Sequence, residues 1–459
     1  MPILPIDTGR YCSTEMKAIF DEQGKLQRLL DVEAALAWAH AQVGDIPKKD
    51  SEKIRRMASV EHVKLSRVKE IEAEIKHDVM AVVRALSEVC GSSGRFVHLG
   101  ATSNDITDTA IALQLRDALL LIDQNLESLE EILLNLSAKE INTPIIGRTH
   151  GQHAIPTTLG FKFAVWLREV SRHIKRIDEC SKRVLVGKMS GAVGTQAGLG
   201  INAMEVQELT MKKLRIRVSE ISTQIVQRDV YAELICILAN IASSLDKFAL
   251  EVRELQRPEI GELAEPFDRE KQVGSSTMPQ KRNPEKSERI CGLAKIIRSL
   301  TIPALENVPT WHERDLTQSS AERFIIPEAC ILTDYILSLM IVVIQGLSID
   351  RVKMLKNINL TQGRVMSENV MITLTRKGMS RQKAHELIRV ISLQSELKER
   401  TFEVALKENE EVMKVLTEED VEVALEPRKY LGTAQTQVNE IILKTQRERL
   451  VRSNNERHL

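Results

Sequence analysis

The apolar residues of three stretches of this chain recur at alternating steps of three and four positions, over residues 119–136, 159–177 and 234–255. This is the heptad spacing, which places one apolar stripe along an α-helix and requires another helix to cover it. The first of these helices, if continuous over residues 108–136, would be about 40 Å long. We therefore expect an all-α fold with a central bundle of long helices.

Composition also favours packed helices over sheets. Aromatic residues make up only 3% of the chain, whereas Leu, Ile, Ala, Glu, Lys and Arg are abundant. A length of 459 residues suffices for two or three domains. Polar and glycine-rich breaks predict an N-terminal helical domain over residues 1–97, the central bundle domain over residues 98–347 and a smaller helical domain over residues 348–459.

The charge balance excludes a general affinity for polyanions. The chain has 64 basic and 64 acidic residues, so no overall field attracts nucleic acid or an anionic membrane. An anionic small molecule must then be drawn by local clusters. The six cysteines are scattered without a CxxC pair and are expected to be free thiols. We expect no metal site and no cofactor.

Targeting signals are also not expected. The first residues have neither a basic start nor an apolar run. The most apolar segment, residues 331–347, is interpreted as too short to span a bilayer. These observations predict a cytoplasmic protein without a membrane partner.

The stretch GSSTMPQKRNP, residues 274–284, is the strongest candidate for chemistry. Pro279 and Pro284 disfavour a helix, so the stretch is predicted to be a loop. Ser275 offers a hydroxyl that can accept a proton once it is deprotonated, and Lys281 and Asn283 offer donors to an anion. This combination suits removal of a proton next to a carboxylate. The alternative is an ordinary exposed loop.

Further polar motifs lie between the apolar stretches. His150 follows Pro144 and is expected on a loop or a first helical turn. His77 belongs to the string KHDV inside a predicted helical run over residues 63–89, where a lone histidine is often structural. The string HLGATSND, residues 98–105, precedes the first long helix. The glycine-rich residues 187–200 lack the GK[ST] ending of a P-loop, which indicates a turn between helices.

The loop at residues 274–284 resembles the signature of the fumarase/aspartase superfamily, whose lyases release fumarate by β-elimination. The Arg-Tyr pair at residues 10 and 11, KHDV, the GRTHGQ that contains His150, and WHERD at residues 311–315 are similar to motifs of the adenylosuccinate lyase family. The similarity extends to EPRKYLGTA near the C-terminal end. It implies fumarate release from adenylosuccinate, giving AMP, and from succinylaminoimidazole carboxamide ribotide (SAICAR), giving AICAR, in a homotetramer with shared active sites.

The resemblance also implies roles for individual residues. Ser275 matches the base, His150 the general acid, and Glu288 the carboxylate that orients the histidine. The succinyl carboxylates would be held by a further set, which comprises Lys281, Asn283, Thr102, Ser103 and Gln224, with Thr149 beside His150. The phosphoribosyl part would be bound by Arg10, Tyr11, His77, Arg314, Ser319 and Arg323. His98 would lie beside the site, and Asp78 and Asp105 would orient neighbours.

Three other readings remain open. Argininosuccinate lyases share the loop but lack the Arg-Tyr start and KHDV. The 3-carboxymuconate cycloisomerases share the loop and an RTxxQHAxPTT string but generally have no histidine at the position of His150. A non-catalytic helical oligomer is disfavoured by the intact Ser275, His150, Lys281 and Glu288. Gln280 departs from the His or Tyr of many family members.

Overall fold

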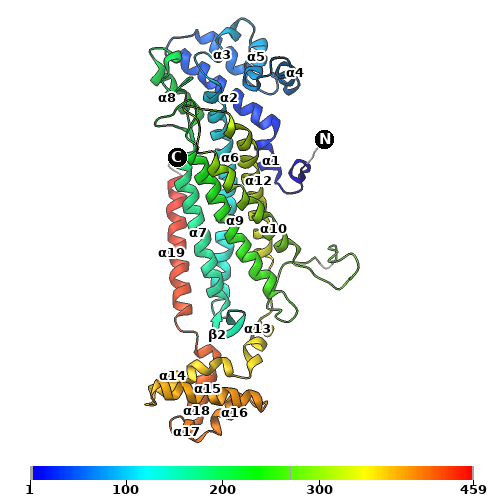
Figure 1. The fold of residues 1–459 in the computed structure, drawn as a ribbon, viewed down its shortest axis with the longest axis vertical. Helices are drawn as coiled ribbons and strands as arrows, with labels where there is room; N and C mark the ends of the chain where they lie inside the picture. The colour runs from blue at the N-terminus through cyan, green and yellow to red at the C-terminus, as the bar shows by residue number, and fades with distance from the viewer. Residues whose placement is uncertain (1–3, 269, 457–459) are drawn as a thin grey trace. The chain divides into compact units, whose positions relative to one another are not determined.

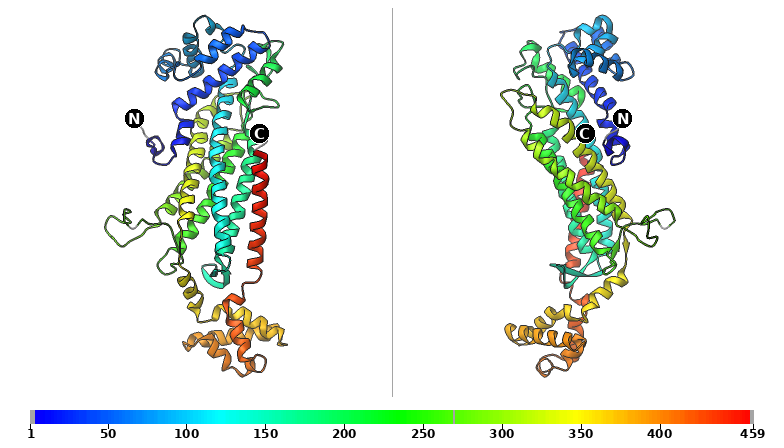
Figure 2. Two further views of the ribbon diagram at one scale, coloured as in Figure 1. Left: turned by 180° about the vertical axis from the view of Figure 1, so that it is seen from behind. Right: turned by 45° about the vertical axis from the view of Figure 1, so that its right-hand side comes forward.

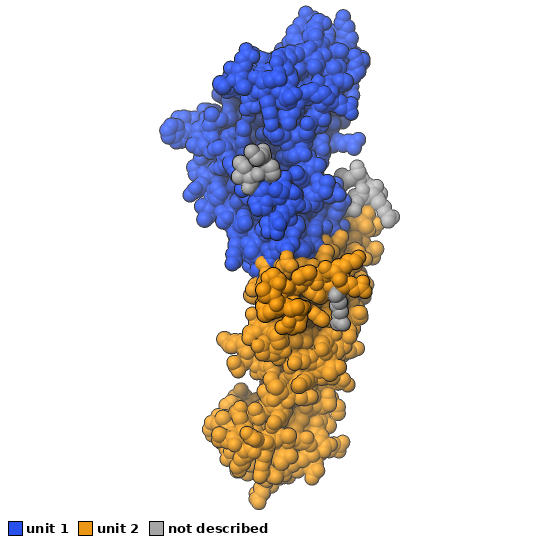
Figure 3. All heavy atoms as spheres, turned by 90° about the vertical axis from the view of Figure 1, so that its right-hand side faces the viewer, with its two compact units in different colours: residues 1–127, 172–246, 289–339 blue, residues 128–171, 247–288, 340–459 orange. Residues whose placement is uncertain are grey.

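The computed structural model describes residues 4–268 and 270–456, with side chains up to residue 454. Its contacts divide the chain into two compact units, each built from three separate stretches (Figure 3). Unit 1 comprises residues 1–127, 172–246 and 289–339, and unit 2 comprises residues 128–171, 247–288 and 340–459. The unit boundaries fall inside the predicted central domain of residues 98–347. The predicted domain limits at residues 97 and 347 therefore remain a prediction. The outermost residues of the first and third predicted domains lie outside the described residues.

Four long helices, α6 (Ser103–Lys139), α7 (Leu159–Val184), α9 (Asp229–Leu255) and α12 (Thr317–Gln345), contribute to both units (Figure 1). The three heptad stripes lie on α6, α7 and α9, and nearly all of their side chains are buried, as predicted. The first helix is longer than expected, with 37 residues and a length of about 55 Å. It begins at Ser103 rather than at residue 107 or 108.

In unit 1, shorter helices form a second core. They are α1 (Thr14–Phe20), α2 (Glu22–Gln42), α3 (Lys48–Met57), α4 (Leu65–Ile75), α5 (Asp78–Cys90) and α8 (Ala203–Leu214). Helix α2 packs against α3 and α8, and α4 packs against α5 (Figures 1 and 2). A side chain of Leu30 or Leu36 in this core is almost fully buried, which typically stabilises a fold by about 1.5–3 kcal/mol.

The helical run predicted over residues 63–89 is two helices. Helix α4 ends at Ile75 because Lys76 adopts a left-handed conformation with φ 58°. His77 then caps α5, with its ring nitrogen accepting the N–H of Met80 at 3.3 Å. The prediction that His77 lies inside a helix is therefore wrong, and its side chain is exposed in the junction between two helices.

Polar contacts join the long helices within unit 1. Asp334 of α12 accepts hydrogen bonds from Ser13, at 2.5 Å, and from Asn125 of α6, at 2.8 Å. His173 of α7 and Ser244 of α9 are 2.9 Å apart. Helices α10 (Glu285–Ser299) and α11 (Thr301–Glu306) precede α12. These buried bonds fix the helices in one register, because each polar atom left without its partner would be costly.

Unit 2 contains a feature that was not predicted, an antiparallel hairpin of β1 (Pro144–Thr149) and β2 (Gln152–Thr158), with a register shift between Ile146 and Arg148. Helix α13 (Arg351–Ile358) packs against β1. Two-residue strands pair elsewhere, β3 (Val186–Gly187) with β4 (Arg217–Val218) in unit 1 and β5 (Leu263–Ala264) with β6 (Ser348–Ile349) in unit 2. The fold is otherwise all-α, as predicted.

The later part of unit 2 consists of short helices followed by a long one. The short helices are α14 (Ser367–Arg376), α15 (Arg381–Leu397), α16 (Phe402–Lys407), α17 (Glu410–Met413) and α18 (Glu418–Leu425), and they share a core around Phe402. Helix α19 (Ala434–Glu456) contacts the bundle, because Arg168 of α7 donates to Glu448 at 2.7 Å. Arg449 and Arg452 both pair with the fully buried Glu130 of α6.

The apolar segment at residues 331–347 belongs largely to α12, which has 29 residues. The expectation that it is too short to span a bilayer is wrong, since α12 is the one helix in the described chain that is long and apolar enough to do so. However, 61% of its most apolar window is buried inside the protein. A buried core helix satisfies the same criteria, so length and composition are weak evidence for a membrane span.

Candidate active site

A cavity of about 770 Å³ in unit 1 collects predicted substrate-binding residues from three distant stretches of the chain. The predicted residues that line it are His77, Asp78, Ser103, Arg314, Ser319 and Arg323. They come from the junction of α4 and α5, from the first turn of α6, and from the loop and first turns of α12. The structure therefore brings together side chains that are more than 200 residues apart in sequence, as in the pair of Asp78 and Arg323.

An ion pair joins two of these residues. Arg323 donates to Asp78 at 2.5 Å, and Lys25 of α2 lies in the same cavity. Burial raises the pKa of Asp78, but hydrogen bonds from the N–H of Val79 and from Arg323, with the charges of Arg323 and Lys25, lower it below its usual range. Burial and the nearby Arg323 lower the pKa of Lys25. Lys25 is a cation of the cavity that the sequence motifs do not reveal.

A buried arginine supports the same cavity. Arg228 donates to Asp108 of α6, at 2.8 Å and 3.0 Å, and to Glu322 of α12, at 2.8 Å and 3.1 Å. Burial raises the pKa of Asp108, but Arg228 and Lys188 outweigh it and lower the value. Burial keeps the pKa of Glu322 raised despite Arg228. The triad joins α6 to α12 through Arg228, the residue before α9. Sequence patterns would assign these charged side chains to solvent.

Gln224 contacts one of the predicted phosphate ligands. Its Oε1 accepts from Nη1 of Arg314 at 2.9 Å, and its Nε2 donates to the carbonyl of Ala192 at 2.8 Å. The Nε of Arg314 is buried and has no hydrogen-bond partner among the described residues. Gln224 thus fixes the Arg314 side chain to the glycine-rich stretch, while the guanidinium keeps donor capacity for a ligand.

Asp105 is fully buried and anchors the start of α6. Its carboxylate accepts from the N–H of Thr102 at 2.9 Å, from the ammonium of Lys188 at 2.6 Å, and from the N–H groups of Ser190 and Gly191 at 2.8 Å and 3.0 Å. These bonds explain why α6 begins at Ser103, since Thr102 and Asp105 close its first turn. Lys188 is an unpredicted partner of Asp105, and the role of Asp105 at the site stays a prediction.

His98 is held by an acid on α2 that the motifs do not indicate. Nδ1 of His98 lies 2.7 Å from Oε1 of Glu33, and its backbone N–H lies 3.1 Å from Oε2. Seven residues further along α2, Nε2 of His40 lies 3.0 Å from the carbonyl of Leu99. Glu33 lies among the apolar residues on the buried face of α2. An acid at such a position is a sequence signal that could have singled it out. His98 does not line the cavity.

Arg10 and Tyr11 also lie outside the lining of the cavity in unit 1. The Nε of Arg10 is 3.4 Å from the hydroxyl of Tyr11, and the Tyr11 ring packs edge-on against Tyr335 at 5.7 Å. Arg289 donates to the Tyr335 hydroxyl at 3.0 Å. The exposed Arg10 side chain therefore lies beside the packed pair of Tyr11 and Tyr335. It has no carboxylate partner among the described residues.

The signature loop of unit 2 surrounds Ser275 with donors. The Ser275 hydroxyl oxygen accepts from the N–H of Thr277 at 3.3 Å and from that of Met278 at 3.1 Å. Two backbone donors aimed at one oxygen favour its deprotonated form. This geometry supplies a physical reason why the oxygen of Ser275 could act as a base.

The ends of this loop are tied together. Nδ2 of Asn283 donates to the carbonyl of Gly274 at 3.0 Å. The backbone at Gly274 passes close to the backbone at Lys281, and a Cβ at Gly274 would lie 2.0 Å from the carbonyl oxygen of Lys281. Only glycine permits this backbone crossing. Glu265 accepts from the N–H groups of Lys286 and Ser287 and thereby caps α10, whose first turn carries the exposed Glu288. The loop is thus fixed at a helix N-terminus, and Lys281 remains exposed.

His150 occupies the tip of the hairpin, as the loop prediction required. It has φ 54° and is followed by Gly151 with φ 73°, a two-residue turn between β1 and β2 that also exposes Thr149. Arg148 pairs with the buried Glu262 through two bonds of 2.8 Å, and Asn357 donates to the same carboxylate at 2.8 Å. These three residues hold the hairpin and were not predicted.

Hydrogen bonds do not join the catalytic candidates of unit 2 to one another in the described part of one chain. Among the described residues, no hydrogen bond joins His150 to Ser275 or to Glu288. No cluster of three or more His, Cys, Asp or Glu side chains in the described part of the chain is placed to hold a metal ion. The roles of Ser275, His150, Lys281 and Glu288 therefore remain predictions.

Comparisons with known proteins agree over nearly the whole chain. A family model described as "Lyase" matches residues 9–298, and one described as "Adenylosuccinate lyase C-terminus" matches residues 363–441. The adenylosuccinate lyase of Pyrococcus abyssi is 53% identical over 96% of this chain and 98% of its own length. That of Methanocaldococcus jannaschii is 47% identical over 96% of each chain.

A solved structure of an enzyme with a different name has the same fold. The 3-carboxy-cis,cis-muconate lactonizing enzyme from Pseudomonas putida is 34% identical, has a TM-score of 0.89, and covers 97% of this chain and 99% of its own. The fold is therefore shared between different activities. The match to the adenylosuccinate lyase C-terminal model, and the higher sequence identity to adenylosuccinate lyases (53%) than to the lactonizing enzyme (34%), place this chain nearer to the adenylosuccinate lyases.

Proposed function

This chain belongs to the adenylosuccinate lyase family, and we propose that it releases fumarate from adenylosuccinate, leaving AMP, and from SAICAR, leaving AICAR, in purine nucleotide biosynthesis. The observation that carries the proposal is the near-complete coverage of its adenylosuccinate lyase relatives. Ser275, His150, Lys281 and Glu288 are all present in the chain and exposed or partly exposed. A non-catalytic oligomer would not require them.

The first step in this proposal is proton removal from the carbon β to the leaving nitrogen. The deprotonated oxygen of Ser275 takes the proton, and the electron pair of the C–H bond moves toward the adjacent carboxylate. Charge then builds up on that carboxylate, where Lys281 and Asn283 can stabilise it. The N–H groups of Thr277 and Met278 stabilise the serine oxygen before the reaction.

Cleavage of the carbon–nitrogen bond completes the elimination. The electron pair returns to form the double bond of fumarate, and the bond to nitrogen breaks with its electrons remaining on nitrogen. His150 donates the proton that this nitrogen needs, and Glu288 orients the imidazole. No redox change takes place, and no cofactor is required for atoms and charges to balance.

The phosphate of the substrate would bind in the cavity of unit 1. Arg314 and Arg323 reach it from α12 and the preceding loop, and His77 from the cap of α5. Guanidinium groups form strong paired hydrogen bonds with phosphate. Asp78 holds Arg323 until the phosphate arrives. Lys25 adds a further positive charge there, and Arg10 and Tyr11 are proposed to approach the phosphate from a second chain.

We also propose that the functional protein is a homotetramer with shared active sites. Among the described residues of one chain no hydrogen bond joins His150 to Ser275 or Glu288, which supports a site completed by another chain. Exposed apolar side chains on helices of unit 1 support an interface between copies, namely Ile296, Ile302, Leu305 and Phe324, which are 41–64% exposed. We expect this assembly in the cytoplasm.

The test is an assay of fumarate release by the purified protein. Adenylosuccinate and SAICAR should be cleaved, whereas argininosuccinate and the nucleoside that lacks the phosphate should not. Ser275→Ala and His150→Gln should each reduce kcat by about 10²–10⁴-fold, the usual contribution of proton transfer. The matched changes Ser66→Ala and His62→Gln, at exposed positions of unit 1, should have no effect. Equal turnover of argininosuccinate would overturn the assignment.

A further inference from the structure

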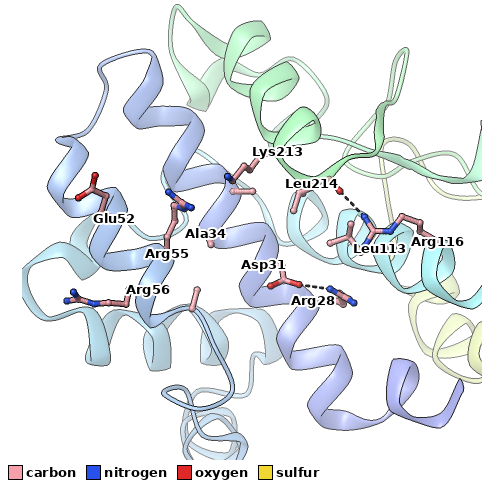
Figure 4. A pocket seen from close by; sticks show the side chains of 12 residues that line it. Arg28, Asp31, Ala34, Glu52, Arg55, Arg56, Leu113, Arg116, Lys213 and Leu214 are labelled. Atoms are coloured by element: carbon pink, nitrogen blue, oxygen red, sulfur yellow. Dashed lines mark hydrogen bonds and ion pairs between the residues drawn. The ribbon is translucent and has the colours of Figure 1, made fainter. Parts of the chain in front are cut away.

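A second cavity of about 540 Å³ lies in unit 1 and contains none of the residues assigned above (Figure 4). Its walls come from α2, α3, α6 and α8. Volumes of about 300–1,000 Å³ are typical of small-molecule sites. The cavity is therefore large enough for a ligand of nucleotide size and is formed by helices rather than by mobile loops.

Basic side chains dominate the lining of this cavity. It contains five of them, Arg28, Arg55, Arg56, Arg116 and Lys213, against the carboxylates of Asp31 and Glu52. The chain as a whole has no net charge, so this excess is a local concentration. A hollow lined by one sign of charge raises the local concentration of ions of the opposite sign.

Two of the basic residues are held in place by internal partners. Arg28 donates to Asp31 at 2.8 Å and to Asp117 at 2.5 Å. The Nε of Arg116 donates to the same Asp117 at 3.1 Å, and its Nη1 donates to the carbonyl of Leu214 at 2.9 Å. These bonds fix two guanidinium groups at the wall and leave part of each one without a hydrogen-bond partner in the described part of the chain.

The other three cations are without a carboxylate partner among the described residues. Arg55 and Arg56 lie in the last turn of α3, and Lys213 lies in the last turn of α8. The ammonium of Lys213 lies 5.1 Å from the centre of the Trp38 ring. In Figure 4 the side chains of Arg55 and Lys213 lie close together beside Ala34 of α2, whereas the Arg56 side chain extends away from them. Their positive charge is available to an anion that enters the cavity.

Part of the wall is apolar, with Ala34, Ala35, Ala58, Leu113 and Leu214. We propose that this cavity binds a phosphate-bearing organic anion of nucleotide size, with the phosphates on the basic side chains and the organic part against the apolar wall. The planar forks of arginine match phosphate oxygens better than a single ammonium does. The site is separate from the substrate cavity and does not depend on the lyase assignment.

The chain offers a direct probe of this site, since it has three tryptophans, Trp38, Trp166 and Trp311. The full-length protein labelled with 5-fluorotryptophan can be titrated by ¹⁹F NMR with pyrophosphate, with ATP, and with adenosine as the phosphate-free control. We expect the Trp38 resonance to shift saturably with pyrophosphate and ATP but not with adenosine. Trp166 is buried in the bundle of unit 2 and serves as the internal reference.

The substrate cavity is distinguished in the same spectra, because Trp311 precedes the cavity residue Arg314 by three positions. The double variant Arg55→Gln/Lys213→Gln should raise the Kd read at Trp38 by at least about tenfold. The control Arg381→Gln/Lys398→Gln, two exposed cations of unit 2, should leave it unchanged. No shift at Trp38, shifts confined to Trp311, binding of pyrophosphate without ATP, or equal Kd values in both double variants would each overturn the proposal.

Discussion

The carboxylate of Glu33 holds His98 at two points, with Oε1 2.7 Å from Nδ1 of the ring and Oε2 3.1 Å from the backbone N–H. His98 adopts a left-handed conformation with φ 66°, which is uncommon for a residue with a side chain. Burial lowers the pKa of His98, but the hydrogen bond and charge of Glu33, with the charge of Asp105, outweigh it and raise the pKa. One acid on α2 therefore sets both the backbone and the protonation of His98.

Replacing this acid should change stability in a pH-dependent way. Because the pKa of His98 is raised in the folded protein, its stabilisation is complete below about pH 6.5, the usual pKa of histidine, and is lost as pH rises through the raised pKa. Glu33→Gln should therefore lower Tm more at pH 5.5 than at pH 9. The control Glu61→Gln, at an exposed position, should lower it at neither pH. Equal losses at both pH values would contradict the charge pairing.

Gly274→Ala should separate the loop's role in activity from its role in stability. The added Cβ would lie 2.0 Å from the carbonyl oxygen of Lys281, so the loop cannot keep its crossing. We expect kcat to fall by about 10²-fold, as for a misplacement of about 1 Å in an active site, with little change in Tm. Gly292→Ala is the matched control, since nothing lies within 4 Å of its added Cβ. Full activity of Gly274→Ala would show that the crossing is not needed.

Arg228→Met should destabilise the protein strongly, because it leaves Asp108 and Glu322 buried without their shared cation. Loss of one partner of a buried ion pair typically costs about 3–5 kcal/mol. Arg257→Met removes an exposed pair with Glu254 and should cost less than about 1 kcal/mol. Urea denaturation measures both changes in the free energy of unfolding. Similar losses of unfolding free energy in the two variants would show that the buried triad contributes no more to stability than an exposed ion pair.

Mixing two inactive variants tests the shared active site. Ser275→Ala and His150→Gln chains alone should each show kcat reduced by about 10²–10⁴-fold. If different chains supply these two residues to one site, tetramers reassembled from both should regain partial activity, because some sites then contain both intact residues. Labelled subunits and mass spectrometry confirm that mixed tetramers have formed. No recovery in such tetramers, or an active monomer in sedimentation, would reject the proposal.

The sequence was sufficient for the long helices and for the loop of residues 274–284, since a heptad stripe and two prolines act locally. It was insufficient where distant contacts decide the structure. Lys76 ends α4 in a left-handed conformation without the glycine or asparagine that usually marks such a position. The hairpin that carries His150 depends on Glu262 and Asn357, more than 100 residues away.

The same limit applies to the candidate site. The motifs named side chains that could meet a substrate, and six of these line one cavity. Glu33, Lys188 and Arg228, which bind His98, Asp105 and the Asp108–Glu322 pair, lie on α2, in the glycine-rich stretch and just before α9, where solvent exposure is the ordinary expectation for a charged side chain. Their roles follow from pairing across the fold, which no local pattern encodes.

The pairing of Glu130 with Arg449 and Arg452 has a consequence for biosynthesis. The acid leaves the ribosome some 300 residues before either arginine does, yet it is fully buried in the finished unit 2. In a nascent chain or a truncated product that stops before α19, Ser171 is the remaining hydrogen-bond partner of this carboxylate among the described residues. Burying the Glu130 charge in that state is unfavourable. Unit 2 can therefore close around Glu130 only when translation is nearly complete, so incomplete chains remain open to chaperones and proteases.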